Sequence, residues 1–154
     1  MISNFGYAAN GMESLVFGAQ DPAILAGKAF EQAFNRGRRG QLWARIFGHT
    51  HQLALLASQP VDAHQPVSGI ISIPIHQIKG TLGRTADFDL DFNPLKEHCR
   101  SRWISILSAI LRGVSLPPVE LVQVGTSYYV RDGHHRISVA RAIGQHAIDA
   151  RIVN

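Results

Sequence analysis

Cysteine is almost absent from this chain of 154 residues, which contains only Cys99. A single cysteine excludes an internal disulfide and a cysteine-rich zinc site, and it suits a reducing compartment, so we expect a cytoplasmic protein. Long apolar runs are missing too, since none approaches the roughly 18 residues of a membrane span. The N-terminus has no basic segment followed by an uninterrupted apolar core. We therefore expect neither a standard export signal nor a membrane partner.

Several motifs that are typical of other nucleotide-binding or hydrolase sites are also absent. The chain contains no Gly-x-x-x-x-Gly-Lys-Ser/Thr loop, no Gly-x-Gly-x-x-Gly after a strand and no Gly-x-Ser-x-Gly elbow. It has no internal repeat and no low-complexity segment. Its 45% of apolar and 17% of charged residues are typical of a globular protein. The net charge of +4 favours polyanionic partners such as nucleic acid or nucleotides.

The N-terminal part of the chain has a helical pattern. Residues 1–20 show no sustained period and indicate a loosely ordered arm. Asp21 and Pro22 then supply an N-cap and a first-turn proline for a helix that runs to about Asn35. The glycines of segment 37–40 predict a break, and apolar residues up to about 56 predict one or two further short helices. We predict that residues 1–65 form an arm and a helical hairpin appendage, ending in a proline-containing linker.

Residues 66–154 have the pattern of the main domain, in which short strands alternate with helices. The order predicts an α+β fold with a small mixed sheet, preceded by the helical appendage. The predicted elements are a strand at 70–75, a glycine-bracketed loop at 80–84, a helix at 101–112, a hairpin of 119–124 and 128–131 with a three-residue loop, a helix at 136–143 and a strand at 147–153.

The junction between the second hairpin strand and the last helix carries the best candidate for a functional site. It reads Asp132-Gly133-His134-His135-Arg136. Glycine permits backbone angles closed to other residues, and the first-turn N–H groups of a helix lack intrahelical partners. The helix dipole and a forked arginine add positive charge, so this junction predicts a phosphate site. Asp132 is expected to be the helix N-cap, with metal binding through a nucleotide as its alternative.

This C-terminal half resembles the ParB-like domain of the ParB/sulfiredoxin fold. In that fold a helix and a proline-started hairpin lead into a glycine-arginine phosphate motif, and the resemblance covers residues from about 73 to 153. The ParB motif runs Gly-Glu-Arg-Arg, so Gly133 and Arg136 match its ends, while His134 and His135 replace its glutamate and first arginine. In sulfiredoxins the run is Gly-Cys-His-Arg, so His135 matches too, and His134 stands where the reactive cysteine would be.

The resemblance implies a nucleotide- or phosphate-binding domain, with CTP, ATP or ADP and Mg²⁺ as ligands. Gly133, His135 and Arg136 would bind the phosphate. The glycine-bracketed loop would contribute Thr81 and Arg84, because ParB-like domains often carry an arginine that faces the nucleotide from this loop.

Several activities are consistent with such a site. Hydrolysis of a nucleoside triphosphate or phosphotransfer would use magnesium bound through an acid such as Asp132 or Asp89 and proton transfer by His134, although His134 could equally be a surface histidine. Without the cysteine, sulfinic-acid reduction is not expected. The alternative is a DNA-binding protein or nuclease related to partition factors, without their helix-turn-helix domain. A third possibility is a regulatory module whose pocket has lost its ligand.

Three further clusters of polar residues have simpler interpretations. Asp87, Asp89 and Asp91 alternate with apolar residues and favour a solvated strand face with Phe88, Leu90 and Phe92 buried. The alternative is that one of these acids holds magnesium against a bound phosphate, whereas an EF-hand calcium loop does not fit. His49 and His51 lie two residues apart, which is not a helical ligand spacing, so no zinc site is predicted. Four arginines make the appendage basic, and they form either a solvated face or a nucleic-acid contact. These arginines are Arg36, Arg38, Arg39 and Arg45.

Overall fold

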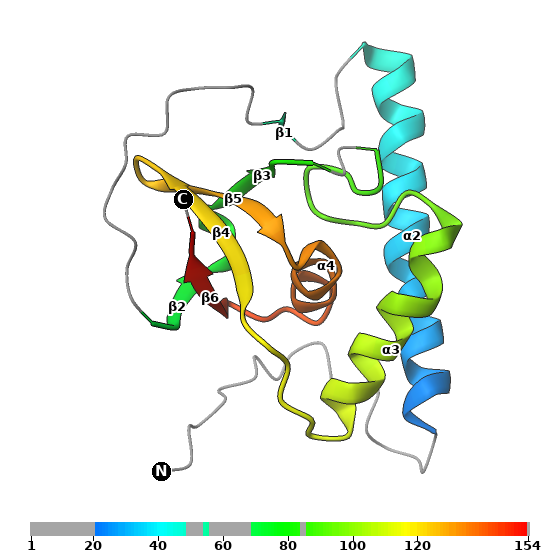
Figure 1. Cartoon of the computed structure of the whole chain (residues 1–154). Coiled ribbons are helices and arrows are strands. Elements are labelled where there is room, and N and C mark those ends of the chain that lie inside the picture. Colours follow the sequence, from blue (N-terminus) through cyan, green and yellow to red (C-terminus); the bar gives the residue numbers. More distant parts are fainter. Residues whose placement is uncertain (1–20, 49–53, 56–68, 84–85, 154) are drawn as a thin grey trace.

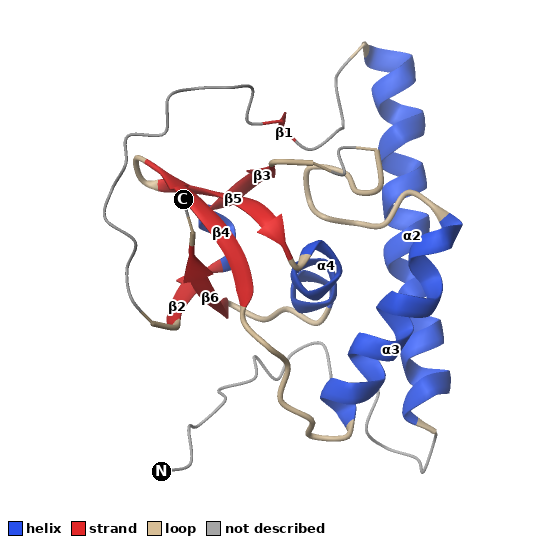
Figure 2. Cartoon of the chain, viewed as in Figure 1, coloured by secondary structure: helices blue, strands red, loops and turns tan. Residues whose placement is uncertain are grey.

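The computed structural model describes residues 21–48, 54–55, 69–83 and 86–153 of the chain (Figure 1). The predicted N-terminal arm, the predicted linker, the histidines at 49 and 51, and Arg84 lie outside the described residues. Within them the fold is an α+β arrangement with one mixed sheet and three α-helices, as the sequence predicted. Figure 2 shows the sheet on one side of the molecule and two long helices on the other.

Helix α2 (Pro22–Phe47) begins where the sequence predicted but ends later. The Asp21 side chain accepts a hydrogen bond of 2.8 Å from the Ala23 N–H, which confirms the N-cap. The predicted break at residues 37–40 is wrong, because the helix continues through it. A Cβ on Gly37 would lie 2.8 Å from the carbonyl oxygen of Pro94, so glycine lets the loop pack directly on the helix.

In the part of the chain that the structure describes, the sheet contains six strands in the order β1-β3-β5-β4-β6-β2. The pairs β4–β5 and β2–β6 are antiparallel, and the other neighbours are parallel. The strands are β1 (Ala54–Leu55), β2 (Ile71–Pro74), β3 (Ile78–Thr81), β4 (Val119–Val124), β5 (Ser127–Asp132) and β6 (Ala147–Ile152).

Three details of the sheet differ from the predictions. Residues 54–55 form a short strand beside β3 where a helix was predicted. Strand β3 includes Gly80 and Thr81, which were assigned to a loop. Only Gly125 and Thr126 separate β4 from β5, so the predicted hairpin is confirmed with a shorter connection. Pro74 ends β2 at the edge of the sheet, as expected for a residue that cannot donate to the ladder.

Helix α4 (His134–Ala142) lies between the sheet and the pair formed by α2 and α3 (Arg100–Leu111), as Figure 1 shows. Two short 3-10 turns, η1 (Ile75–Gln77) and η2 (Glu97–Cys99), precede β3 and α3. Trp103 of α3 is fully buried, and its Nε1–H donates 2.9 Å to the hydroxyl of Ser138 on α4. The ring of Phe30 on α2 meets the indole edge-on at 5.6 Å. One apolar core therefore joins all three helices to the sheet. The domain boundary near residue 65 stays a prediction.

Candidate functional site

The junction of β5 and α4 requires glycine at position 133. Gly133 is the N-cap residue of α4 and has a φ of +104°, in the left-handed region. A Cβ at this position would lie 2.5 Å from Cγ1 of Val119, so both the backbone conformation and the available space exclude a larger residue. No side chain caps α4. The prediction that Asp132 caps the helix is wrong, because its carboxylate faces Arg136 instead.

Arg136 is fixed against the backbone at the start of β4. Its Nη1 donates to the carbonyl oxygens of Pro117 at 2.5 Å and Pro118 at 2.8 Å, and its Nη2 donates to Oδ2 of Asp132 at 2.6 Å. The arginine side chain is only 12% exposed, whereas that of Asp132 is 65% exposed. A guanidinium has five N–H donors, so these bonds hold it in place while leaving donor capacity. The result is a nearly immobile cation beside the first turn of α4.

His134 is buried rather than on the surface. Its Nε2 lies 2.5 Å from the hydroxyl oxygen of Thr81, and its ring stacks on Phe88 with 6.2 Å between the centroids. The interpretation as an adjacent surface histidine is therefore wrong. A role in proton transfer stays a prediction, and the contact with Thr81 fixes the orientation of the imidazole ring.

Thr81 and His134 are a second pair of predicted site residues in direct contact, besides Asp132 and Arg136. Thr81 is fully buried at the end of β3, and its hydroxyl also contacts the carbonyl oxygens of Gly83 and Val130. It accepts a hydrogen bond of 2.9 Å from the Gly83 N–H. The threonine therefore links the loop after β3 to the first residue of α4. Arg84, the other residue predicted from this loop, lies outside the part that the structure describes.

His135 is also buried, and it packs against an aromatic ring. Its imidazole meets Phe88 edge-on at 5.2 Å, so the same phenylalanine contacts both histidines. The prediction that His135 neutralises a phosphate stays a prediction. Contact of Phe88 with this site was not predicted, because no sequence signal links residue 88 to the histidines.

The acidic segment of residues 87–91 is a turn and not a strand with a solvated face. Asp89 is fully buried, and its Oδ1 accepts hydrogen bonds from the N–H groups of Asp91 at 2.9 Å and Asn93 at 2.8 Å. Leu90, which was expected to be buried, is 43% exposed, although Phe88 and Phe92 are buried as predicted. The solvated-face interpretation is therefore wrong for Asp89, whose carboxylate organises the loop.

Arg141 anchors α4 at its C-terminal end. Its Nη2 donates to the carbonyl oxygens of Ile75 at 3.3 Å and Ile78 at 3.2 Å, and its guanidinium lies 5.1 Å from the centre of the Phe92 ring. Burial lowers the pKa of this guanidinium from its usual value, and the charges of Asp91 and Asp89 oppose that shift. Arg141 therefore positions the helix that carries the candidate site.

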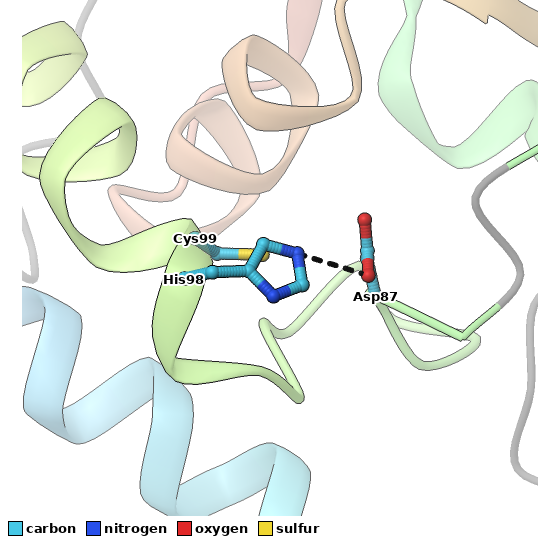
Figure 3. A group of neighbouring side chains, drawn as sticks. All are labelled: Asp87, His98 and Cys99. Atoms are coloured by element: carbon cyan, nitrogen blue, oxygen red, sulfur yellow. Dashed lines mark ion pairs between the residues drawn. The ribbon is translucent and has the colours of Figure 1, made fainter.

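A second group of potential ligands, Asp87, His98 and Cys99, was not predicted from the sequence. One oxygen, one nitrogen and one sulfur atom from these residues lie within 4.8 Å of one another. Figure 3 shows the histidine ring and the sulfur atom turned toward the aspartate. Only the adjacency of His98 and Cys99 was visible in the sequence.

The basic arginines of α2 have unequal environments. Arg36 donates 3.3 Å to the side-chain oxygen of Asn93, so it contacts the loop before α3. Arg38, Arg39 and Arg45 are exposed near the C-terminal half of the helix and line a surface hollow of about 450 Å³. Four large apolar side chains are exposed on the same stretch of α2. Together with these three arginines they form a surface that we call the α2 patch. The apolar members are Leu42, Trp43, Ile46 and Phe47.

Comparison with known proteins gives limited similarity. No family model matches the chain, and no curated protein matches it. Among solved structures, it is similar to sulfiredoxin from Arabidopsis thaliana, with 21% sequence identity and a TM-score of 0.41. The match covers 56% of this chain and 85% of the sulfiredoxin chain. At that TM-score the match assigns neither a family nor an activity.

Membrane insertion has no support among the helices of the described segments. None of them combines the length and the hydrophobicity that crossing a bilayer requires.

Proposed function

We propose that this protein binds a phosphorylated ligand, a nucleotide such as CTP, ATP or ADP, at the junction of β5 and α4. The observation that carries the proposal is an α-helix without a side-chain cap that begins at a left-handed glycine, with Arg136 immobilised beside its first turn. First-turn N–H groups and the helix dipole favour an anion at this position. The resemblance of the run from Gly133 to Arg136 to the ParB-like phosphate motif supports the same assignment.

The ion pair between Asp132 and Arg136 suggests how the ligand would enter. The Asp132 carboxylate supplies an anionic oxygen to Nη2, and a phosphate oxygen would make the same kind of bond. Asp132 is exposed, so it can move aside for a free phosphate. With magnesium present, Asp132 can instead bind the metal ion, and the metal ion contacts the phosphate. Nucleotide hydrolysis or phosphotransfer would extend this binding, with His134 as the proton-transfer group oriented by Thr81.

Calorimetric titration with CTP, ATP and ADP, each with and without magnesium, tests the proposal. At least one nucleotide is expected to bind the unmodified protein, and Arg136→Ala is expected to weaken binding about 10–100-fold. That range corresponds to the roughly 1.5–3 kcal/mol of a hydrogen bond to a charged group. Arg102→Ala removes the same charge from an exposed position on α3 and should leave the affinity unchanged.

Folding of the arginine variant must be checked, because the carbonyl groups of Pro117 and Pro118 lose their donor. Arg136→Lys keeps the charge but loses the fork, and it should give an intermediate affinity. The proposal is wrong if none of the three nucleotides binds, or if binding to folded Arg136→Ala equals that of the unmodified protein.

A second candidate function, nucleic-acid binding, is favoured by the α2 patch. Trp43 and Phe47 are 60% and 58% exposed and stack on each other at 5.2 Å, among three exposed arginines. Aromatic faces flanked by cations are the features that single-stranded nucleic acids bind through base stacking and phosphate contacts. DNA is the partner that we propose for this surface, and nuclease activity with magnesium or manganese would be a further property.

Gel-shift titration over a series of salt concentrations tests the DNA proposal. Affinity for a single-stranded oligonucleotide is expected to fall steeply with salt, and Trp43→Ala should cost about 1–3 kcal/mol of stacking energy. Ile24→Ala, at an exposed apolar position near the other end of α2, should have no effect. Absence of a shift at low salt would exclude this function, and intact plasmid after incubation with either metal would exclude a nuclease.

A further inference from the structure

The loop before α3 and the turn that begins α3 place three different donor atoms together. Nε2 of His98 lies 3.2 Å from Oδ1 of Asp87, and Sγ of Cys99 completes a group whose atoms are all within 4.8 Å of one another (Figure 3). Asp87 precedes the buried turn at Asp89, whereas His98 and Cys99 belong to η2. The group therefore joins two segments that are 11 residues apart in the sequence.

The separations are close to those of a four-coordinate metal centre. Zinc bonds of about 2.0–2.3 Å in a tetrahedron place neighbouring ligand atoms roughly 3.3–3.8 Å apart. The distance of 3.2 Å between His98 and Asp87 is just below that range, and the widest separation in the group exceeds the upper limit of the range by about 1 Å or less. Small movements of the three side chains would bring all the separations into the range.

The backbone around the group is held by other bonds, so the ligands are arranged before a metal binds. The N–H of Leu95 donates 2.8 Å to the carbonyl oxygen of Asp87, and the N–H of Cys99 donates 3.1 Å to that of Lys96. The next residue, Phe88, is fully buried. A metal would therefore not have to order the loop, which would otherwise reduce its affinity.

The donor set selects the class of metal. Calcium and magnesium prefer oxygen ligands, whereas a thiolate, an imidazole and a carboxylate together are typical of zinc and of its substitute cobalt. We propose that Asp87, His98 and Cys99 form a zinc site with three protein ligands and a water molecule in the fourth position. The side chain of His98 is 64% exposed, so the fourth position of the metal would face solvent.

Metal binding at this site replaces the S–H bond of Cys99 by a bond between sulfur and zinc. The displaced proton passes to the buffer, and the neutral imidazole of His98 donates its lone pair. The thiol is buried, so the ion reaches it from the side of the exposed histidine. Bound zinc therefore holds the loop of Asp87 against the start of α3. This loop also carries Phe88, which contacts both histidines at the start of α4.

Cobalt titration of the full chain, purified in the presence of a chelator and then freed of it, tests this proposal. Cys99 is the only cysteine of the chain, so a thiolate-to-cobalt charge-transfer band can arise only from this residue. A single equivalent of Co²⁺ should produce the band together with visible bands of tetrahedral cobalt. Zn²⁺ should displace the cobalt and so remove these bands. Zinc should also raise the melting temperature of the protein, because it binds the folded state.

Variants then assign the ligands. His98→Ala should weaken cobalt binding by more than the roughly 10–100-fold that loss of an outer-shell partner costs, and Asp87→Asn should act in the same direction. His76→Ala, at an exposed histidine outside the group, should leave the titration unchanged. Cys99→Ser should abolish the charge-transfer band.

Two outcomes would overturn the zinc site. One is the absence of a thiolate band with the unmodified protein, and the other is an unchanged titration for both His98→Ala and Asp87→Asn. If Cys99→Ser fails to fold, these two variants, which alter less buried positions, still decide the question. Nucleotide binding at the β5–α4 junction uses other residues, so either proposal can fail while the other stands.

Discussion

Replacing Gly133 by alanine is expected to destabilise the folded protein by about 2–5 kcal/mol. The left-handed conformation costs a residue with a Cβ about 1–2 kcal/mol, and the clash with Val119 adds about 1–3 kcal/mol of overpacking. Val119 is fully buried at the start of β4, so it cannot turn away without disturbing the sheet. Urea unfolding followed by circular dichroism measures the difference.

Gly144 is the matched control because it shares the backbone conformation but not the crowding. Its φ is +73°, and no atom lies within 4 Å of an added Cβ. Gly144→Ala should therefore cost only the conformational part, about 1–2 kcal/mol. An equal loss of folding free energy in the two variants would show that the contact with Val119 adds nothing. It would contradict the claim that crowding by Val119 excludes a larger residue between β5 and α4.

The Asp89→Ala substitution is expected to cost on the order of 3 kcal/mol or more. The carboxylate accepts two backbone hydrogen bonds, from Asp91 and Asn93, and Oδ2 accepts a third at 3.0 Å from the Asn93 side chain. These partly buried hydrogen bonds have a charged acceptor, and such a bond contributes about 1.5–3 kcal/mol. The same turn contains Phe92 with a φ of +60°, a conformation that the bonds to Asp89 help to hold.

Two variants separate the bonds of Asp89 from a general effect of removing charge. Asp89→Asn keeps one acceptor oxygen and should cost less than the alanine variant. Asp149→Ala removes an exposed carboxylate from β6 and should change the free energy of unfolding by no more than about 0.5 kcal/mol. A cost for Asp89→Ala no larger than for Asp149→Ala would contradict the role assigned to the buried turn.

Local signals in the sequence predicted the features that depend on neighbouring residues. The N-cap at Asp21, the hairpin of β4 and β5, and a helix that follows Gly133 are all predicted from residues within a few positions of each other, although α4 begins two residues before the predicted start. The candidate site was found for the same reason, because strand, glycine and arginine are adjacent in the chain. Burial of His134 was not predictable, since its partners Thr81 and Phe88 come from distant segments.

The failed predictions at Gly37 and Asp89 have different physical causes. Gly37 was interpreted as a helix break, but it is a contact point for the loop at Pro94 and Leu95. The alternation around Asp89 is the pattern of a strand, yet the chain turns there because the carboxylate bonds to the backbone beyond it. The contact at Gly37 leaves no pattern in the sequence, because tertiary packing overrides local propensity there. The bonds of Asp89 are local, within four residues, and compete with the strand that the alternation predicted.

Amide chemical-shift mapping during nucleotide titration tests the central proposal most directly. In the ¹⁵N-labelled protein, CTP, ATP or ADP should shift the backbone amides of Gly133 and the first turn of α4 more than those elsewhere, and Arg136→Ala should reduce these shifts at the same concentration. Shifts confined to other parts of the chain, or the absence of shifts with all three nucleotides in the presence of magnesium, would contradict a phosphate site at the β5–α4 junction.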